Sequence, residues 1–331
     1  MLMSKLTTRR EMLRATSAVA GGALLARFFP GTLLAGAARP MAYPQQAGAA
    51  PADPLTAIRA QMGATPLETL KLSDTLTMLS GPGGNVVVLN GPDGKVVVDS
   101  FVQNVWAKLK QTLDGVGNAP IRLLIDTHWH FDHTDNNANF RAAGAQILAH
   151  ENTKKRLSEP HDLLGMHFPP SPASALPTQT FTATHRMQAN GENVVLGYIP
   201  LAHTDTDIYI QYQRANVIHL GDTYFNGMYP FIDAGTGGSI NGMIAAANRS
   251  LGLVDANTKI VPGHGPLSDR AALTRYRNVL VTVRDRVQRE KTAGKSVQEV
   301  VAAKPTAEFD ATWGMGFMQP DVFVTIVYNT L

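Results

Sequence analysis

The chain has 331 residues, of which 44% are hydrophobic and 17% charged, values typical of a globular protein and incompatible with a disordered one. Its net charge of +3 is concentrated at one end: residues 1–39 hold six basic residues and one acidic residue, so the remainder carries −2. That remainder has no basic stripe, which argues against a nucleic-acid partner. Cysteine is absent, which excludes disulfides and thiolate ligands.

The first 37 residues have the features of an export signal. Arg9 and Arg10 precede a modest apolar stretch, and residues 35–37 form a small Ala-Gly-Ala site, a pattern that resembles a bacterial twin-arginine signal peptide. Arg27 and Pro30 interrupt the apolar stretch before it reaches the roughly 20 residues of a membrane-spanning helix. We therefore expect export by the twin-arginine translocase, cleavage, no stable membrane anchor afterwards, and a periplasmic or secreted mature protein.

An Ala- and Pro-rich segment, residues 38–54, lacks a hydrophobic period and predicts a linker to a domain that spans residues 55–331. Two Val-rich runs at 84–90 and 95–100 flank a Gly-Pro-Asp-Gly turn and predict a β-hairpin. A helix is expected from about 102 to 113. The apolar run at 121–126 then predicts a buried strand that ends at a histidine-rich motif.

Strands and helices continue to alternate beyond this motif. Ser268 is the expected N-cap of a long helix, and Ser296 with Glu299 predicts a capping box on a shorter one. Together these helices form a C-terminal extension over about 268–331. The other expected elements are strands at 145–150, 192–200, 207–212, 216–222 and 258–262 and a helix at 238–251. This alternation predicts a layered α/β domain.

The motif Thr-His-Trp-His-Phe-Asp-His at 127–133 places three histidines and an aspartate within six positions. His128 and His130 are two residues apart in an extended turn and can point the same way. Asp132 and His133 begin the next turn and point elsewhere. Because zinc takes imidazole and carboxylate ligands that converge from loops, this one loop can serve two metal sites.

Two metals need more ligands than one loop supplies, and the downstream strands offer them. His203, Asp222 and His264 each follow or end a predicted strand, where functional groups tend to lie on a rigid scaffold. We interpret all three as further metal-ligand candidates.

The ordered set His-x-His-x-Asp-His, then His, Asp and His, resembles the metallo-β-lactamase superfamily over roughly residues 70–270. The resemblance implies an αββα sandwich, two mixed β-sheets flanked by helices, with a binuclear metal site at one edge between the sheets. It implies a first zinc held by His128, His130 and His203, a second held by Asp132, His133 and His264, and Asp222 as the bridge.

The residues around Asp222, Gly-Asp-Thr-Tyr-Phe at 221–225, are closer to the glyoxalase II and lactonase branches than to β-lactamases that use cysteine at this position. The segment 226–231 lacks the basic, glycine-rich character of glyoxalase II, which argues against a glutathione thioester. Tyr224 is a candidate for polarising a substrate carbonyl, beside the alternative that it only packs. Asp132 is the candidate that orients the nucleophile.

The resemblance implies a zinc-dependent hydrolase. Two Zn²⁺ ions would share a water and supply hydroxide that attacks an ester, lactone, thioester or amide (β-lactam) carbonyl of a small molecule. Iron and manganese stay open as metals. The alternatives are an iron-dependent oxygenase of the persulfide dioxygenase type and a non-catalytic metal-binding protein, and the oligomeric state is open.

Four other histidines are assigned other roles. His219 and His150 are interpreted as structural. His161 and His167 lie in a Pro-rich insertion that is expected to be a solvated loop, with a wall of the substrate site as the alternative. Specificity is expected to depend on the loops at 158–176 and 224–240.

Overall fold

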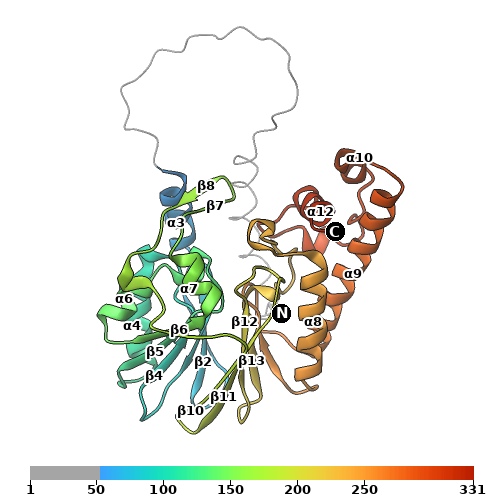
Figure 1. The fold of residues 1–331 in the computed structure, drawn as a ribbon. Helices are drawn as coiled ribbons and strands as arrows, with labels where there is room; N and C mark the ends of the chain where they lie inside the picture. The colour runs from blue at the N-terminus through green and yellow to red at the C-terminus, as the bar shows by residue number, and fades with distance from the viewer. Residues whose placement is uncertain (1–52) are drawn as a thin grey trace, which may run out of the picture.

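The computed structural model describes residues 53–331, and the expected leader at 1–37 lies outside the described residues. The described chain begins with α3 (Pro54–Gly63), whose N-cap Asp53 accepts a hydrogen bond from the Thr56 amide, close to the expected domain start. Two β-sheets lie face to face with helices on their outer sides, as Figure 1 shows. This is the mixed α/β sandwich that the sequence predicts.

The first sheet has seven strands in the order β1-β2-β3-β4-β5-β6-β9. They are β1 (Glu68–Lys71), β2 (Leu76–Gly81), β3 (Gly84–Leu89), β4 (Lys95–Val98), β5 (Ile121–Ile125), β6 (Gln146–His150) and β9 (Gln179–Phe181). Neighbours from β1 to β4 are antiparallel, and the pairs from β4 to β9 are parallel. Parallel neighbours need crossovers, and these contain η1 (Gln103–Val105) with α4 (Trp106–Val116), α5 (Phe131–Thr134) with α6 (Asn137–Ala142), and α7 (Glu151–Leu157).

The second sheet has five strands in the order β10-β11-β12-β13-β14. They are β10 (Thr184–Ala189), β11 (Glu192–Tyr198), β12 (Ile208–Tyr212), β13 (Val217–His219) and β14 (Lys259–Val261). Strands β10 to β13 are antiparallel, while β13 and β14 are parallel and joined through α8 (Ile240–Leu253). All five strands expected from the sequence between 145 and 262 are present, and the strand expected at 216–222 is shorter than predicted.

Strand β3 shows why the layers form. Val86 and Val88 belong to the cluster under the outer helices, whereas Val87 and Leu89 belong to the cluster between the sheets. Successive side chains of a strand point to opposite faces, so a continuous run of valines is buried on both sides. The adjoining β4 pairs with β3 in register, which confirms the predicted hairpin.

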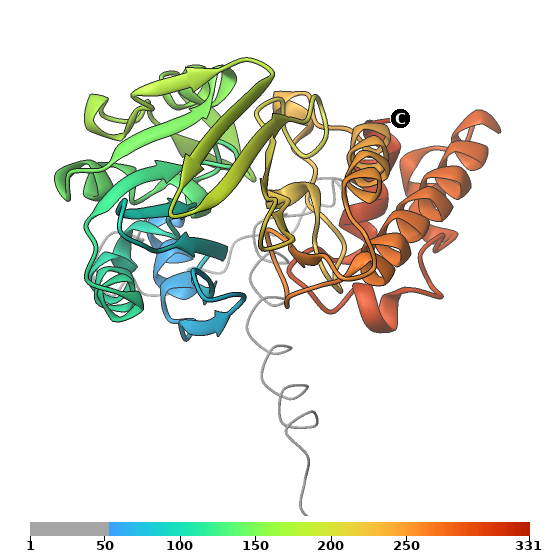
Figure 2. The same ribbon diagram turned by 90° about the horizontal axis from the view of Figure 1, so that it is seen from below.

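The C-terminal extension packs outside the second sheet, on the side away from the first (Figure 2). It contains α9 (Arg270–Thr292), α10 (Val297–Ala302), α11 (Asp310–Trp313) and α12 (Pro320–Asn329). The capping box of Ser296 and Glu299 is confirmed. The N-cap of α9 is Asp269, which accepts the Ala272 amide at 2.7 Å, so the assignment to Ser268 was wrong: the Ser268 hydroxyl is instead hydrogen-bonded to Tyr224 at 2.6 Å.

The Pro-rich insertion is not a plain loop. It contains a small hairpin of β7 (His161–Leu163) and β8 (Met166–Phe168), turned by Leu164 and Gly165 at positive φ. Leu163, Met166 and Phe168 bury their side chains in the cluster under the outer helices of the first sheet. Among residues 53–331, no helix is both long enough and apolar enough to cross a bilayer.

Candidate metal centre

Loops at the same edge of both sheets bring the ligand candidates together. A bend at residues 127–129 follows β5, and His130 (φ −62°, ψ 149°) then precedes the helical turn α5, which contains Asp132 and His133. The second sheet contributes His203 after β11, Asp222 after β13 and His264 after β14. The convergence therefore depends on the face-to-face arrangement of the two sheets.

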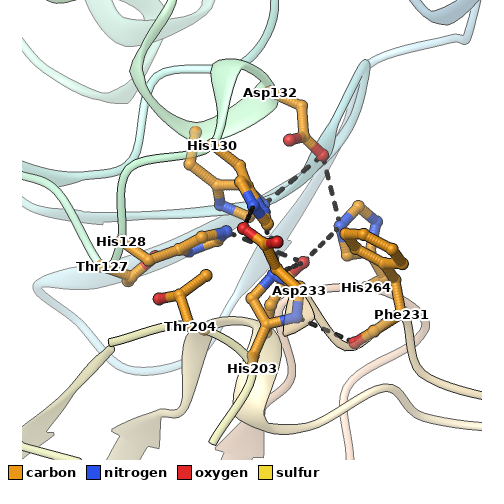
Figure 3. Close-up of polar contacts among 12 residues, drawn as sticks. Thr127, His128, His130, Asp132, His203, Thr204, Phe231, Asp233 and His264 are labelled. Atoms are coloured by element: carbon orange, nitrogen blue, oxygen red, sulfur yellow. Dashed lines mark hydrogen bonds and ion pairs between the residues drawn. The ribbon is translucent and has the colours of Figure 1, made fainter. Parts of the chain in front are cut away.

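The seven side chains form three overlapping groups whose ligand atoms lie within 4.8 Å of one another. The groups are His128–His130–His203, His128–His133–Asp222 and Asp132–His133–His264. All are buried except His264, whose side chain is 16% exposed. Figure 3 shows His128, His130 and His203 together, with Asp132 and His264 on one side of the cluster. The structure thus unites all seven residues that the sequence singled out.

Asp222 lies at the centre of the cluster. Its Oδ1 is 3.3 Å from His133 Nε2, and its Oδ2 is 3.2 Å from His264 Nε2 and 3.5 Å from His203 Nε2. A side chain at Gly263 would place its Cβ 2.0 Å from Asp222 Oδ1, so glycine at this position leaves room for the carboxylate.

Each central imidazole turns one nitrogen toward the protein and the other toward the cluster. His133 Nδ1 is 2.8 Å from the Asp99 carboxylate, and His203 Nδ1 donates to the Phe231 carbonyl at 2.8 Å. His130 Nε2 is 3.2 Å from Asp233 Oδ2, which leaves His130 Nδ1 facing His203 Nε2 at 2.9 Å. Such contacts fix ring orientation and tautomer, as around metal-bound histidine.

Some of the atoms directed into the cluster have no hydrogen-bond partner in the protein. His128 Nε2, His133 Nε2 and Asp222 Oδ1 are buried without a hydrogen bond. Leaving buried polar atoms unpaired costs on the order of 1–3 kcal/mol each, and a divalent cation with tetrahedral preference uses this kind of donor set. The residues present therefore fit a metal centre.

The histidines of the cluster differ in the direction in which their pKa is shifted. Burial and the neighbouring His130 lower the pKa of His203 to about 4, and burial likewise lowers the pKa of His128 well below its usual value. Burial opposes charge on His264 too, but the carboxylates of Asp222 and Asp132 outweigh it and raise the pKa to about 9. His128 and His203 are thus neutral at pH 7, the form in which imidazole binds metal.

Sequence reasoning missed Asp99 and Asp233. Asp99 follows β4 at φ +64° and accepts from the Thr127 amide and hydroxyl, both at 2.8 Å, as well as facing His133. Asp99 directly follows the buried strand β4, at the sheet edge where the ligand candidates lie, and this position could have identified it from the sequence. Asp233 lies in an irregular segment, held by the Thr236 hydroxyl at 2.6 Å, and no sequence pattern marks it. Figure 3 shows Asp233 and Phe231 directed at His130 and His203.

The remaining candidates occupy supporting positions. Tyr224 is fully buried, and its hydroxyl is hydrogen-bonded to Ser268 and Asn226, so the geometry favours packing over contact with a substrate carbonyl. His219 is buried, and its Nε2–H donates a hydrogen bond to the Asn85 carbonyl at 3.1 Å, as expected for a structural histidine. His150 is also structural: it stacks on Tyr198 at 3.9 Å between ring centroids.

The insertion at 158–176 lines a cavity of about 350 Å³ that residues of the metal loop also line. Trp129 and Phe131 alternate with the ligands and line it together with His161 and Phe168. The ring of Trp129 is 4.8 Å from both His130 and His161. His161 and His167 therefore both belong to the cavity wall. The His167 side chain is also exposed and is paired with Asp162 at 2.9 Å.

Two helix-covered sheets with a histidine and aspartate cluster at one edge define a metal-binding αββα protein. The sequence model of the metallo-beta-lactamase superfamily matches residues 79–265, more than half of the chain. The chain therefore belongs to the metallo-beta-lactamase superfamily. A search of curated proteins found no match.

Solved structures share the fold at low sequence identity. A metallo-beta-lactamase from Pontibacter korlensis aligns with TM-score 0.56 and 16% identity over 65% of this chain and 99% of its own. DIM-1 metallo-beta-lactamase aligns with TM-score 0.54 and 16% identity over 66% of this chain and 99% of its own. The sec-alkylsulfatase Pisa1 from Pseudomonas sp. aligns with TM-score 0.59 and 13% identity over 80% of this chain and 50% of its own. At these identities the likeness shows the fold alone.

Proposed function

We propose that the protein is a binuclear zinc hydrolase that cleaves an ester, lactone, thioester or amide bond of a small molecule. The supporting observation is the set of inward, unpartnered atoms in the cluster, His128 Nε2, His133 Nε2 and Asp222 Oδ1. In this proposal one ion is held by His128, His130 and His203 and the other by Asp132, His133 and His264, with Asp222 shared. When bound, the ions lower the pKa of a water and stabilise negative charge on oxygen.

The residues of the chain have distinct tasks in this proposal. Asp132 keeps 12% of its side chain exposed, and burial, which would raise its pKa, is outweighed by His133 and His264, so that the pKa lies far below its usual value. Its carboxylate is therefore ionised at neutral pH and accepts a hydrogen bond from the attacking water. The water oxygen bonds to the acyl carbon and the acyl–heteroatom bond breaks. One proton of the water goes to the leaving group and the other stays with the acid product, while Asp132 orients the water.

The family also contains metal-dependent enzymes of other chemistry, so the test must separate them. Metal content of the purified mature protein, measured by mass spectrometry, should be close to two zinc ions per chain. Activity should appear on a panel of ester, lactone and β-lactam substrates, with an alkyl sulfate included. Stoichiometric iron with a visible absorption band would contradict the zinc assignment and favour the oxygenase alternative.

Replacing the shared carboxylate provides the matched mutational test. Asp222→Ala should lower both metal retention and kcat by at least about 100-fold, because it removes the residue that both groups share. His219→Asn is the control, since His219 is equally buried but its Nε2 donates to a backbone carbonyl. It should reduce stability yet keep the metal. Equal loss of metal in the two variants would contradict the ligand assignment.

We further propose that residues 1–37 form a twin-arginine signal and that the mature protein works in the periplasm or outside the cell. The paired arginines at positions 9 and 10 support this. A route that exports folded proteins suits a chain whose ligands meet only after both sheets have formed.

A further inference from the structure

Aromatic rings contact the exposed part of the metal cluster. His264 is the most exposed ligand candidate, with 16% of its side chain accessible. One face of its ring stacks on Phe225, which is fully buried, at 5.1 Å between centroids and 5° between planes. Phe317 lies 5.9 Å from the same imidazole and is only partly buried.

A second partly buried ring borders the other histidines. Phe231 lies 5.9 Å from His130 and 5.8 Å from His203, measured between ring centroids. Its backbone carbonyl accepts the His203 Nδ1 proton, so the same residue holds a ligand with its main chain and presents an aromatic side chain beside the cluster. Figure 3 shows this ring next to the ligand histidines. Together, the side chains of Phe231 and Phe317 form what we call the aromatic collar.

Phe317 belongs to the C-terminal extension, outside the residues 79–265 that the family model matches. The extension is fixed against the segment after Asp222: the Tyr229 amide donates to the Trp313 carbonyl at 3.0 Å. Gly316 packs so closely on Met228 that an added Cβ would lie 2.8 Å from the Met228 Cβ. The neighbouring Met318 is buried in the same core. The position of Phe317 is therefore set by packing.

The charged groups around the cluster do not favour an anionic substrate tail. The ion pairs of the Asp132 and Asp222 carboxylates are made with cluster histidines. Among residues 53–331, neither carboxylate is ion-paired with a lysine or an arginine. An uncharged apolar group beside the cluster would instead cover Phe231 and Phe317.

We propose that the aromatic collar is the specificity element of the site and that it selects substrates whose non-reacting part is an uncharged alkyl or aryl group. The proposal rests on the hydrolase function proposed above. Burying apolar surface against the two rings stabilises the complex in proportion to the area covered. A carboxylate in the same place would lose hydration and gain no ion pair.

Binding of alkyl hydroxamates tests the collar without any turnover. Acetohydroxamate, hexanohydroxamate and octanohydroxamate share a metal-chelating head and differ only in chain length. Titrated into the zinc-loaded protein in a calorimeter, their affinity should rise about two- to fourfold per added methylene until the collar is covered. Equal affinity across the series would overturn the proposal. Absence of binding by all three would overturn both the collar and the metal assignment.

Variants locate the effect on the two rings. Phe317→Ala and Phe231→Ala should each flatten the dependence on chain length, whereas Phe317→Leu should restore part of it. Met315→Ala is the matched control, because Met315 lies in the same extension and is 57% exposed. Melting temperatures identify any variant that fails to fold. If Phe317→Ala fails to fold, the test uses Phe317→Leu instead. If hydroxamate affinity rose with chain length as steeply in a folded Phe317→Ala protein as in the wild type, the role of Phe317 would be overturned.

Hydrolysis assays separate this proposal from the function on which it depends. The 4-nitrophenyl esters of acetate, butyrate and octanoate should show rising kcat/KM with chain length, chiefly through KM, and the 4-nitrophenyl monoester of adipic acid should be disfavoured. Chain-dependent hydroxamate binding without hydrolysis of any panel substrate would contradict the hydrolase function and leave the collar standing. Hydrolysis that is indifferent to chain length would contradict the collar alone.

Discussion

At the scale of single residues, the supporting groups decide which nitrogen of each imidazole is free. Asp99 faces His133 Nδ1, and the Phe231 carbonyl takes the proton of His203 Nδ1. Asp233 faces His130 Nε2 and also donates its own amide to the His203 carbonyl at 2.9 Å. One irregular segment thus orients two ligand histidines at once. We therefore expect its hydrogen bonds to affect metal affinity even though Asp233 is not itself a ligand candidate.

Asp233→Ala should therefore weaken zinc affinity by about 10–100-fold, because His130 loses the partner that fixes its tautomer. Asp233→Asn keeps an acceptor and should lose less. The measurement is competition with a chromophoric chelator. Asp205→Ala is the control, since Asp205 is ion-paired with Arg156 at 2.7 Å instead of with an imidazole. Equal loss of affinity in the two alanine variants would contradict the orienting role.

At the scale of elements, strand ends carry the chemistry and helices hold those ends in place. The ligand candidates after β11, β13 and β14 leave the second sheet at the same edge, and α8 and α9 pack over that sheet's outer face. Helix α9 has 23 residues and begins shortly after His264. Its N-terminus is stabilised locally by Asp269 and by the contact of Ser268 with Tyr224.

Asp269→Ala should lower the free energy of unfolding by about 1 kcal/mol, because the Ala272 amide loses its acceptor at the helix start. Asp269→Asn retains a good capping side chain and should change stability by only a few tenths of that amount. Urea unfolding followed by circular dichroism measures both. If the asparagine variant were as unstable as the alanine variant, the cap would not be the cause.

At the scale of the whole molecule, the metal cluster connects the two halves of the sandwich. Its ligand candidates at 128–133 follow the first sheet, and those at 203, 222 and 264 belong to the second. Two buried imidazole nitrogens and one carboxylate oxygen between the halves, His128 Nε2, His133 Nε2 and Asp222 Oδ1, make no hydrogen bond with the protein. We therefore expect metal binding to contribute to the stability of the folded arrangement.

Removing metal with a chelator should lower the melting temperature, and added zinc should restore it in a concentration-dependent way. At a free zinc concentration 100 times Kd, the gain is about 2.7 kcal/mol per site. Magnesium, which prefers oxygen ligands, should not substitute. An unchanged melting temperature after demonstrated loss of metal would show that the cluster does not stabilise the fold.

Export also concerns the whole chain, and the leader offers a clean test. Replacing Arg9 and Arg10 together by lysine keeps the positive charge but removes the guanidinium pair that the translocase recognises, so the precursor should stay in the cytoplasm. Fractionation of a bacterial host, scored for a species shortened by roughly 37 residues, measures this. A double-lysine form that still reached the periplasm at the wild-type level would contradict the twin-arginine route.

The sequence by itself determined the elements whose signals are local. The Val-rich runs of β3 and β4 are buried on both faces, and the capping box of Ser296 and Glu299 closes its own helix turn. The 127–133 motif carries four ligand candidates, three histidines and one aspartate. The other candidates at 203, 222 and 264 were identifiable because metal-binding residue types follow apolar strands. Short polar strands were not identifiable from the sequence. Strand β1 is exposed throughout, and β10 consists mostly of polar and charged residues.

Only the tertiary structure decided which groups support the metal centre and which border it. Asp233 contacts His130 although the two are 103 positions apart in the sequence. Phe317, which lies in the C-terminal extension, contacts His264. Tyr224 is turned to Ser268 by the packing of the extension, although its sequence position beside Asp222 suggested a catalytic role. The physical reason is that a hydrogen-bond partner or ring neighbour of a buried side chain is set by where two sheets and their helices pack, and no local pattern encodes that distance.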